Sequence, residues 1–576
     1  MEQRTQIGYL VGGGLKENFR VRLTVSPQEI QEGAFVVIQS GWWNYYGIVT
    51  DIQLGATDPR FADEQTEVRF PAHIAKALHG QTLYANLEVL PNLMLNLEVL
   101  PNLMLEVGPE LGTPEYKDWQ GRIAAGLKDA PRILPVKNVP PHHAVVSLAN
   151  EGDIAEIFGD PNKEGNFVIG YTREQNHPVC IDLDKFVQRS SGVFGATGTG
   201  KSFLTRLVLA GLMKHNQASV LVLDMHNEYG FDDVASDTKK AVKGLKTLFK
   251  GGVRCVGLGA GSTIRGNQVD FNLEISTGDI STSDIETLSR ELNLRETTPT
   301  ILNALYGTFK EKWFAAFRSM SRETVMIEDE RGKTKEVPAE GSVAKWAMEN
   351  GVNVMAAEAL HDKLRRLFSQ PYIVDNPAAD SVAQIIQSLE AGKHVVLSFG
   401  EHESDLDYLL VSNLLTRKIR AAWEKKTNEF RTHGKAEPRP LIIVVEEAHK
   451  LLNREMAAQT TFATIARELR KYYVTLLIVD QRPSQIYDEV MSQLGTRISG
   501  WLGDDLDIQA VLSGLSGRDS LRGMLARLQP KEEVLLLGWG VPMPLPVRSR
   551  RYDEAFWKEM GKGKRSSEEI NRELGF

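Results

Sequence analysis

Short runs in which hydrophobic and polar positions alternate fill the first quarter of the chain. Between Ile7 and about Val146, apolar residues recur at every second position, and turn residues such as Gly12 and Gly55 separate the runs. The runs that read as strands are IGYLVGG, FRVRLTV, GAFVVIQS, NYYGIVTDIQL and TEVRF. Many short strands with turns between them are typical of a small antiparallel barrel. The pattern therefore predicts a β-barrel and its linker over residues 1–146.

From about Val145 the period changes, and buried apolar runs alternate with helical stretches. This alternation predicts a parallel α/β sheet, whose first part we place at residues 147–280. Residues 281–390 read as mostly helical with one charged loop, EDERGKTKEVPAEG, and are interpreted as an insertion. The sheet resumes over residues 391–552 with the runs HVVLSF, LIIVVEEA and YVTLLIVDQ. Residues 553–576 form a charged tail.

A perfect ten-residue repeat, NLEVLPNLML, occurs at Asn86 to Leu95 and again at Asn96 to Leu105. Two copies of so short a unit do not make a solenoid. We interpret the repeat as a duplication tolerated in a surface loop, because loops absorb insertions at little entropic cost.

Composition and charge exclude several classes of protein. Hydrophobic residues make up 42% and charged residues 25% of the 576 residues, the balance of a folded globular chain. The formal charge of −8 means that any contact with nucleic acid is local rather than spread over the surface. Two distant cysteines, Cys180 and Cys255, exclude a disulfide framework and a cysteine-rich metal site. No membrane segment or secretory signal is visible, so we expect a cytoplasmic protein.

The strongest chemical signal is a complete phosphate-binding loop, GATGTGKS, between an apolar strand and a helix. Its glycines let backbone N–H groups point at phosphate oxygens, Lys201 reaches the terminal phosphates, and the Ser202 hydroxyl binds Mg²⁺. The predicted cofactors are therefore ATP and Mg²⁺. The expected nucleotide-binding residues are Gly195, Ala196, Thr197, Gly198, Thr199, Gly200, Lys201, Ser202 and Phe203.

Polar residues follow three of the buried strands. The strand LIIVVEEA ends in two carboxylates, of which Glu446 is expected at the metal and Glu447 as the base that activates water. The next strand ends in DQRPS, which places Gln481 beside the nucleotide as a sensor of the γ-phosphate. LVLDMHNEYG places Asp224, His226 and Glu228 after another strand, where a role near the phosphates and simple loop polarity stay open.

The barrel runs and the ordered elements GATGTGKS, LDMHNEY, VVEEAH, RELRKYY and DQRPS resemble the HerA family of prokaryotic DNA translocases, from about Ile7 to Arg551. The resemblance implies an α/β, RecA-like P-loop NTPase with an N-terminal small β-barrel and a helical insertion. It also implies a homo-hexameric ring that moves double-stranded DNA with the energy of ATP. The expected partner is a NurA-like nuclease in DNA-end processing, or another effector such as a sirtuin-like NAD hydrolase in defence against phage.

Two arginines take their roles from this resemblance alone. Arg470, in RELRKYY, and Arg189, in the QRSSG stretch before the phosphate-binding loop, match arginines that act between neighbouring subunits of the family. The chain departs from the family pattern at Leu469 and Tyr473, which replace glycines, and at Asp480, which stands where threonine is common.

Two alternatives to a HerA-type motor stay open. The related FtsK and conjugation ATPases share the motor core, but membrane spans are missing here and the barrel is present. A different class of function is an ATP-switched ring platform that recruits and activates an effector with little translocation. Both uses need the same nucleotide site, so the residues do not separate them.

Overall fold

The computed structural model describes residues 4–15, 17–55, 94–106, 108–109, 112–125, 133–173, 175–235, 239–328, 334–456, 462, 469–515 and 518–561. The chain divides into two compact units. One comprises Met1–Asp182 with Gly514–Arg550, and the other comprises Leu183–Ser513 with Arg551–Phe576. Each unit combines segments that are far apart in the sequence.

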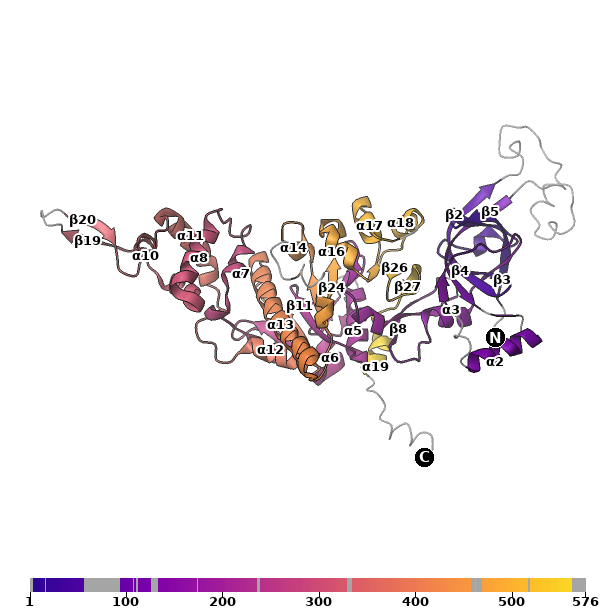
Figure 1. The fold of residues 1–576 in the computed structure, drawn as a ribbon, viewed down its shortest axis with the longest axis horizontal. Coiled ribbons are helices and arrows are strands. Elements are labelled where there is room, and N and C mark those ends of the chain that lie inside the picture. The colour runs from indigo at the N-terminus through magenta and orange to yellow at the C-terminus, as the bar shows by residue number, and fades with distance from the viewer. Residues whose placement is uncertain are drawn as a thin grey trace, which may run out of the picture. The chain divides into compact units, whose positions relative to one another are not determined.

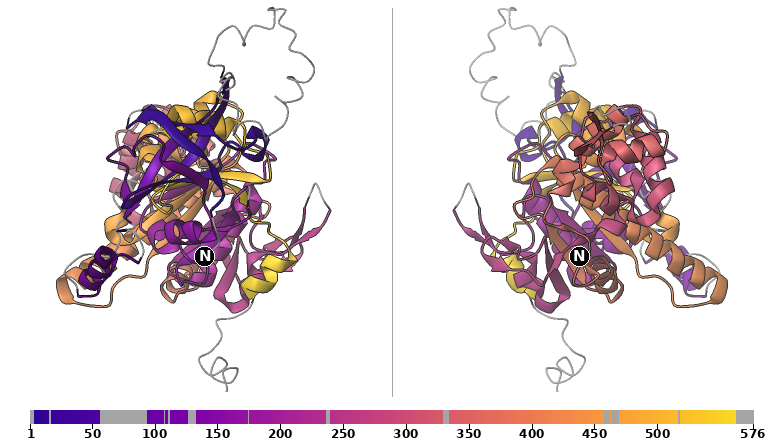
Figure 2. Two further views of the ribbon diagram at one scale, coloured as in Figure 1. Left: turned by 90° about the vertical axis from the view of Figure 1, so that its right-hand side faces the viewer. Right: turned by 90° about the vertical axis from the view of Figure 1, so that its left-hand side faces the viewer.

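The first unit contains the predicted barrel, whose strands appear in indigo and violet in Figure 1 and in the left view of Figure 2. Antiparallel strands pair in the order β2-β1-β7-β3-β4-β5-β6, and β2 also pairs with β5, which closes the wall. Apolar side chains on alternate positions fill the interior, including Ile7, Phe19, Val36 and Val49. The strands are β1 (Gln6–Gly14), β2 (Glu17–Leu23), β3 (Phe35–Ser40), β4 (Trp43–Gly55), β5 (Met94–Glu106), β6 (Ile133–Pro135) and β7 (Val145–Leu148).

The second copy of the repeat is part of this wall. Asn96 to Leu105 lies within β5, which pairs with both β4 and β2, so the interpretation of the repeat as a surface loop is wrong for that copy. Pro101 is tolerated in the strand because it faces Gly47 at an irregularity in the register, where a ladder hydrogen bond is dispensable. The first copy up to residue 93, and the predicted strand TEVRF, lie outside the described residues.

Smaller elements complete the first unit. A second antiparallel set pairs β26 (Glu533–Gly538), β27 (Leu545–Ser549), β8 (Asn166–Tyr171) and β9 (Pro178–Asp182) in that order. The helices are α2 (Pro114–Ala124), α3 (Glu151–Phe158) and α18 (Arg518–Ala526). Arg173 forms an ion pair with Glu533 at 2.8 Å, and so joins the two sequence segments of the unit.

The second unit is built on a parallel sheet in the order β17-β14-β22-β11-β23-β24-β10-β25. Its central strands are buried on both faces, which explains their unbroken apolar sequences. The strands are β10 (Ser191–Phe194), β11 (Ser219–Asp224), β14 (Val253–Leu258), β17 (Phe271–Leu273), β22 (His394–Ser398), β23 (Leu441–Glu446), β24 (Val474–Asp480) and β25 (Thr496–Ser499).

The strand order decides which loops meet. β24 lies between β10, which leads into the phosphate-binding loop, and β23, which ends in the acidic pair. Because all three run in parallel, their carboxyl ends share one edge of the sheet. The mixed α/β architecture, the parallel sheet and the barrel confirm the predicted fold class.

Helices flank the sheet and make up most of the segment between β17 and β22 (Figure 1). Asp284 anchors this segment, since its carboxylate accepts hydrogen bonds from Asn413 and Arg417 of the long helix α13. The helices of this unit include α5 (Lys201–His215), α7 (Thr282–Glu286), α8 (Thr298–Phe309), α9 (Trp313–Ser319), α10 (Val343–Glu349), α11 (Val354–Phe368), α12 (Ser381–Glu390) and α13 (Asp405–His433).

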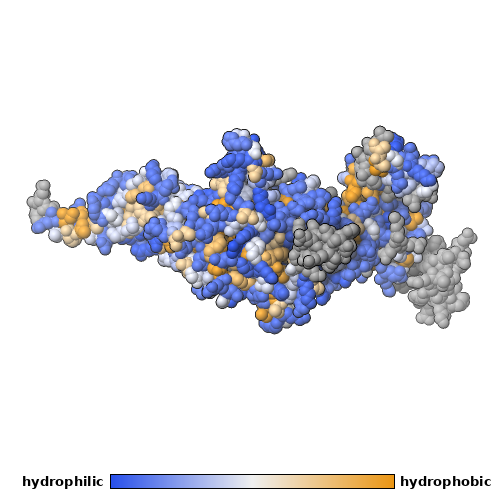
Figure 3. Space-filling view, turned by 90° about the horizontal axis from the view of Figure 1, so that it is seen from below, coloured by the Kyte–Doolittle hydropathy of each residue, from blue (hydrophilic) through white to orange (hydrophobic). Residues whose placement is uncertain are grey.

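Part of the expected charged loop is a strand instead. Thr334–Pro338 forms β20 and pairs with β19 (Thr324–Glu328) in an antiparallel hairpin. Val325 lies opposite Val337, and β-branched residues favour strand pairing. This preference outweighs the loop-like composition of the segment. The hairpin exposes Val325, Met326 and Ile327, which form an apolar group at the left end of Figure 3.

Among the described residues, no helix combines the length and hydrophobicity that a membrane crossing requires.

Candidate nucleotide site

The phosphate-binding loop lies between β10 and α5, as its sequence predicts. Gly198 and Gly200 have φ angles of +76° and +91°, a backbone region that glycine adopts without steric cost. Gly200 also caps α5, and it has no side chain to occupy the N–H groups of the first helical turn. These N–H groups, at the positive end of a 15-residue helix, form a ready site for phosphate oxygens.

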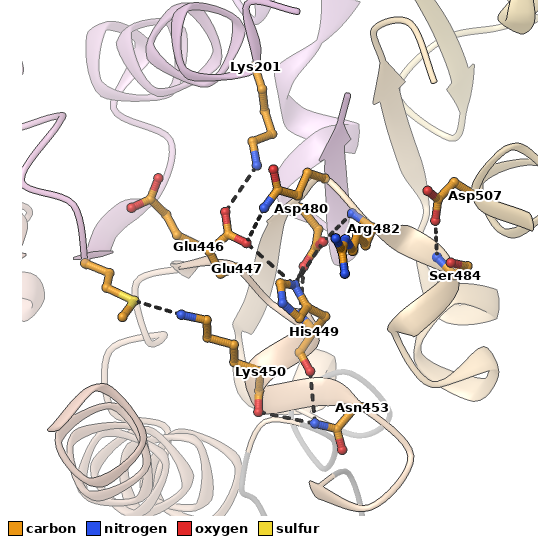
Figure 4. Close-up of polar contacts among 12 residues, drawn as sticks. Lys201, Glu446, Glu447, His449, Lys450, Asn453, Asp480, Arg482, Ser484 and Asp507 are labelled. Atoms are coloured by element: carbon orange, nitrogen blue, oxygen red, sulfur yellow. Dashed lines mark hydrogen bonds and ion pairs between the residues drawn. The ribbon is translucent and has the colours of Figure 1, made fainter. Parts of the chain in front are cut away.

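Lys201 and Glu447 are brought together from separate parts of the chain (Figure 4), and Gln481 joins them from a third. Lys201 Nζ lies 3.4 Å from Glu447 Oε1, and Gln481 Nε2 donates to Glu447 Oε2 at 3.1 Å. The hydroxyl of Thr197 donates to Gln481 Oε1 at 2.6 Å, which connects the loop to the same network. The three strand ends thus place a cation, a carboxylate and an amide around one point at the edge of the sheet.

The backbone of Glu447 is held in an uncommon conformation. Its φ angle is +45°, a region that a glutamate avoids unless the surrounding structure compensates. Such strain is characteristic of residues whose side chains must point in one direction.

Glu446, in contrast, is buried beneath this point. Tyr229 donates to its Oε1 at 2.6 Å, and Oε2 has no hydrogen-bond partner among the described residues. Burial raises the pKa of the Glu446 carboxyl well above its ordinary value, and the charge of Asp224 adds to this rise. Burial also raises the pKa of Asp224 to about 6, although it accepts hydrogen bonds from the backbone of Tyr229 and Glu228.

These features fit a divalent cation. The buried Glu446 oxygen without a hydrogen-bond partner is a suitable ligand. A bound cation would also stabilise the ionised forms of Glu446 and Asp224, which burial disfavours. Among the described residues no cluster of three or more acidic, histidine or cysteine side chains surrounds a metal position. Mg²⁺ would therefore be held by Glu446 and the Ser202 hydroxyl together with phosphate oxygens and water, as is usual for this ion.

The three polar residues after β11 have different environments. Asp224 turns the chain by accepting the N–H groups of Glu228 and Tyr229 at 2.7 and 3.0 Å. The carbonyl of Glu228 accepts a hydrogen bond from Arg206, and His226 is exposed. Asp224 thus holds Tyr229 against Glu446, an indirect connection to the site.

A further pair of residues joins the site, and although both belong to motifs named above, the sequence does not show that they meet. His449 Nδ1 lies 3.0 Å from Asp480 Oδ2 and 3.7 Å from Glu447 Oε2. Asp480 is fully buried, and also accepts the backbone N–H groups of His449 and Arg482, each at 2.7 Å. The two residues are far apart in the chain, so only the pairing of β23 with β24 brings them together.

The two arginines expected to act between subunits lie away from this site. Arg189 precedes β10 and Arg470 precedes β24, whereas the phosphate-binding loop and Gln481 follow those strands. Seven residues of β24 extend about 20 Å, so the backbone of Arg470 is at the opposite edge of the sheet. Arg470 belongs to the 3-10 helix η8 (Leu469–Tyr472), and most residues between positions 457 and 468 lie outside the described residues.

The chain is similar to known helicases in sequence. Residues 167–419 match the family model described as "Helicase HerA, central domain". The chain is 22% identical over 558 residues to the DNA double-strand break repair helicase HerA of Sulfolobus acidocaldarius, covering 95% of this chain and 93% of that protein. It is 23% identical over 489 residues to the helicase of the same name from Pyrococcus furiosus, covering 81% of this chain and 83% of the relative.

Two solved structures show a more distant similarity. The bacterial conjugative coupling protein TrwBdeltaN70 aligns with 70% of this chain and 92% of its own, at a TM-score of 0.44 and 12% identity. VirB4 of Thermoanaerobacter pseudethanolicus aligns with 69% of this chain and 99% of its own, at a TM-score of 0.41 and 16% identity.

Proposed function

We propose that this chain, which belongs to the HerA family of helicases, is an ATP-driven motor that moves along double-stranded DNA. The observation that carries the proposal is the network of Thr197, Gln481, Glu447 and Lys201 beside the N-terminus of α5. It combines a phosphate cradle with a carboxylate that can act as a base, the combination that ATP hydrolysis requires. The relatives named DNA double-strand break repair helicases support DNA as the substrate.

In the proposed mechanism, Lys201 exchanges its partner when ATP binds. Before ATP binds, its ammonium group contacts Glu447, as in the structure. Once phosphate oxygens occupy the cradle, the ammonium group turns to them. Glu447 is then free to accept the proton of the attacking water, and Gln481 orients that water from the next strand. Mg²⁺ bound at Glu446 and Ser202 would neutralise charge that develops on the phosphates.

We also propose that the chain works as a homo-hexameric ring with ATP sites shared between neighbours. The nucleotide site follows β10 and β24, whereas Arg189 and Arg470 precede these strands. The backbone of each arginine therefore lies at the edge of the sheet opposite to the phosphate-binding loop. An arginine supplied by a neighbour can accelerate phosphoryl transfer by ~10³ to 10⁵. This placement supports a role in trans for both residues.

Mixing inactive subunits tests the shared site. Arg470→Ala and Lys201→Ala should each be inactive alone, whereas mixed rings should recover hydrolysis where an intact Lys201 faces an intact Arg470. The same experiment with Arg189→Ala tests the second arginine. Lys201→Ala mixed with Glu447→Gln is the matched control, because both changes damage the same subunit's site and cannot complement each other. No recovery in verified mixed rings would contradict catalysis in trans.

Binding to double-stranded DNA should weaken steeply with salt and depend little on sequence. A net charge of −8 confines the contact to a local basic surface, and gripping backbone phosphates releases counterions. We expect affinity for a 40-base-pair duplex, a length chosen at roughly four helical turns, to fall at least tenfold between 50 and 200 mM salt. Fluorescence anisotropy with two unrelated duplexes measures both properties. Affinity that is unchanged by salt would favour the ATP-switched platform instead.

The barrel is the surface on which we propose that a NurA-like nuclease or another effector docks. Large apolar side chains are exposed there, with Tyr9, Leu15 and Trp42 at 38%, 55% and 51% of their full accessibility. Exposed apolar groups on a closed barrel favour protein contacts. With a nuclease as its partner, the motor would serve DNA-end processing. With another effector, it would serve defence against phage.

A further inference from the structure

Asp480 occupies a position from which one carboxylate controls two loops. It accepts the backbone N–H of His449 after β23 and the backbone N–H of Arg482 after β24. Glu447 lies in the first of these loops and Gln481 in the second. The buried carboxylate therefore fixes the two chain segments that carry the proposed base and its amide partner.

The side chain of His449 lies between this carboxylate and Glu447. Its Nδ1 is 3.0 Å from Asp480 Oδ2 on one side and 3.7 Å from Glu447 Oε2 on the other. Gln481 Nε2 contacts the same oxygen of Glu447 at 3.1 Å. One hydrogen-bond donor, Gln481 Nε2, and the imidazole of His449 at ion-pair distance thus converge on Glu447 Oε2 from different loops. The backbone of Glu447 has the uncommon φ angle of +45°.

We propose that Asp480 and His449 form a positioning pair for Glu447, in which the buried carboxylate holds a cationic imidazole against the base and so links ATP turnover to the charge of His449. The inference deepens the proposed function and rests on it for the role of Glu447. His449 acts through Glu447 and is a positioning residue.

The charges around His449 support the cationic form. Burial alone would lower the pKa of His449, but the hydrogen bond and negative charge of Asp480 outweigh burial and raise it, with a smaller contribution from Glu447. Lys450, on the same short helix, opposes this rise. A polar groove also borders His449, and its charged residues are Arg290, Glu291, Asp405, Lys450, Arg454 and Glu455.

The sign of the pH dependence follows from this raised pKa. His449 keeps its charge above the ordinary histidine pKa of about 6.5 and loses it as pH rises further. Turnover should therefore decline on the alkaline side as the imidazole becomes neutral. Without a cation at this position, that decline should disappear.

The primary test compares wild type with His449→Asn, which retains an amide donor for Asp480 but carries no charge. DNA-stimulated ATP hydrolysis is followed from pH 6 to 9.5, and ATP affinity is measured with a fluorescent analogue. We expect the variant to bind ATP within about twofold of wild type, to hydrolyse it about tenfold more slowly at neutral pH, and to lack the alkaline decline. Asp405→Asn is the control, since it removes a neighbouring negative charge whose ion-pair partner is Lys450, the residue next to His449.

A second measurement does not depend on hydrolysis. NMR of protein labelled at its 12 histidines gives the pKa of His449, whose signal is the one missing from His449→Asn. In Asp480→Thr this pKa should fall by about one unit or more, because the buried anion is gone. Wild type that hydrolyses no ATP would contradict the proposed function, while this titration would still report on the pair.

Two results would overturn the inference. One is a pH profile of ATP hydrolysis by His449→Asn that has the same shape as the wild-type profile. This result would overturn the inference even if the variant unfolded at a lower temperature than wild type. The other is a His449 pKa that is the same in wild type and in Asp480→Thr.

Discussion

Replacing Lys201 with alanine should reduce ATP hydrolysis by at least about 10³-fold, to the background of the assay. Lys201 is the first residue of α5 and directs its ammonium group to the point where Glu447 and Gln481 meet. Without it, the cradle keeps its backbone N–H groups but loses the full positive charge that meets the γ-phosphate. Steady-state release of phosphate in the presence of DNA measures the effect.

Lys214→Ala is the matched control for this change. Lys214 lies in the last turn of the same helix, where it donates to the backbone carbonyl of Glu559 at 3.0 Å. The control should hydrolyse ATP at the wild-type rate, and thermal unfolding of both variants shows whether α5 remains intact. Phosphate release at the wild-type rate from Lys201→Ala would remove the assignment of the phosphate-binding loop.

Replacing Glu447 with glutamine should lower turnover by roughly 10² to 10⁴-fold while ATP still binds. The amide keeps the size of the side chain and spares the cradle, but it cannot accept a proton from water. Its carbonyl oxygen can still accept the hydrogen bond from Gln481 Nε2, while its NH₂ group then replaces the oxygen that contacts Lys201. Turnover and the affinity for a fluorescent ATP analogue, measured on the same preparation, separate chemistry from binding.

Glu446→Gln and Glu455→Gln complete this experiment. The first removes the buried oxygen proposed to hold Mg²⁺ and should raise the Mg²⁺ concentration needed for activity. The second changes an exposed glutamate in the following loop and should have no effect. If Glu446→Gln bound ATP without turnover and Glu447→Gln stayed active, the roles of the two carboxylates would be reversed.

The local pattern of the chain predicted most of the architecture. Alternating residues from Ile7 to Ile52 predicted the strands of the barrel, and unbroken apolar runs such as Leu441 to Val445 predicted the buried parallel sheet. The expectation was wrong for the second NLEVLPNLML copy, where a tandem duplication suggested a surface loop, and for Thr334–Pro338, where charged residues suggested a loop. In both cases pairing with a neighbouring strand outweighed local composition, and such pairing cannot be read from one segment alone.

The sequence by itself determined which residues could bind phosphate, since a strand, GATGTGKS and a helix follow one another directly in the chain. Only the tertiary structure decided how the other residues surround that loop. Inserting β24 between β10 and β23 brings Gln481 to Glu447 and Asp480 to His449, and it leaves Arg470 at the far end of the strand. Strand order depends on pairing between separate segments of the chain, such as Leu441 with Val474 and Ser191 with Leu477, whereas the phosphate-binding loop is made by eight consecutive residues.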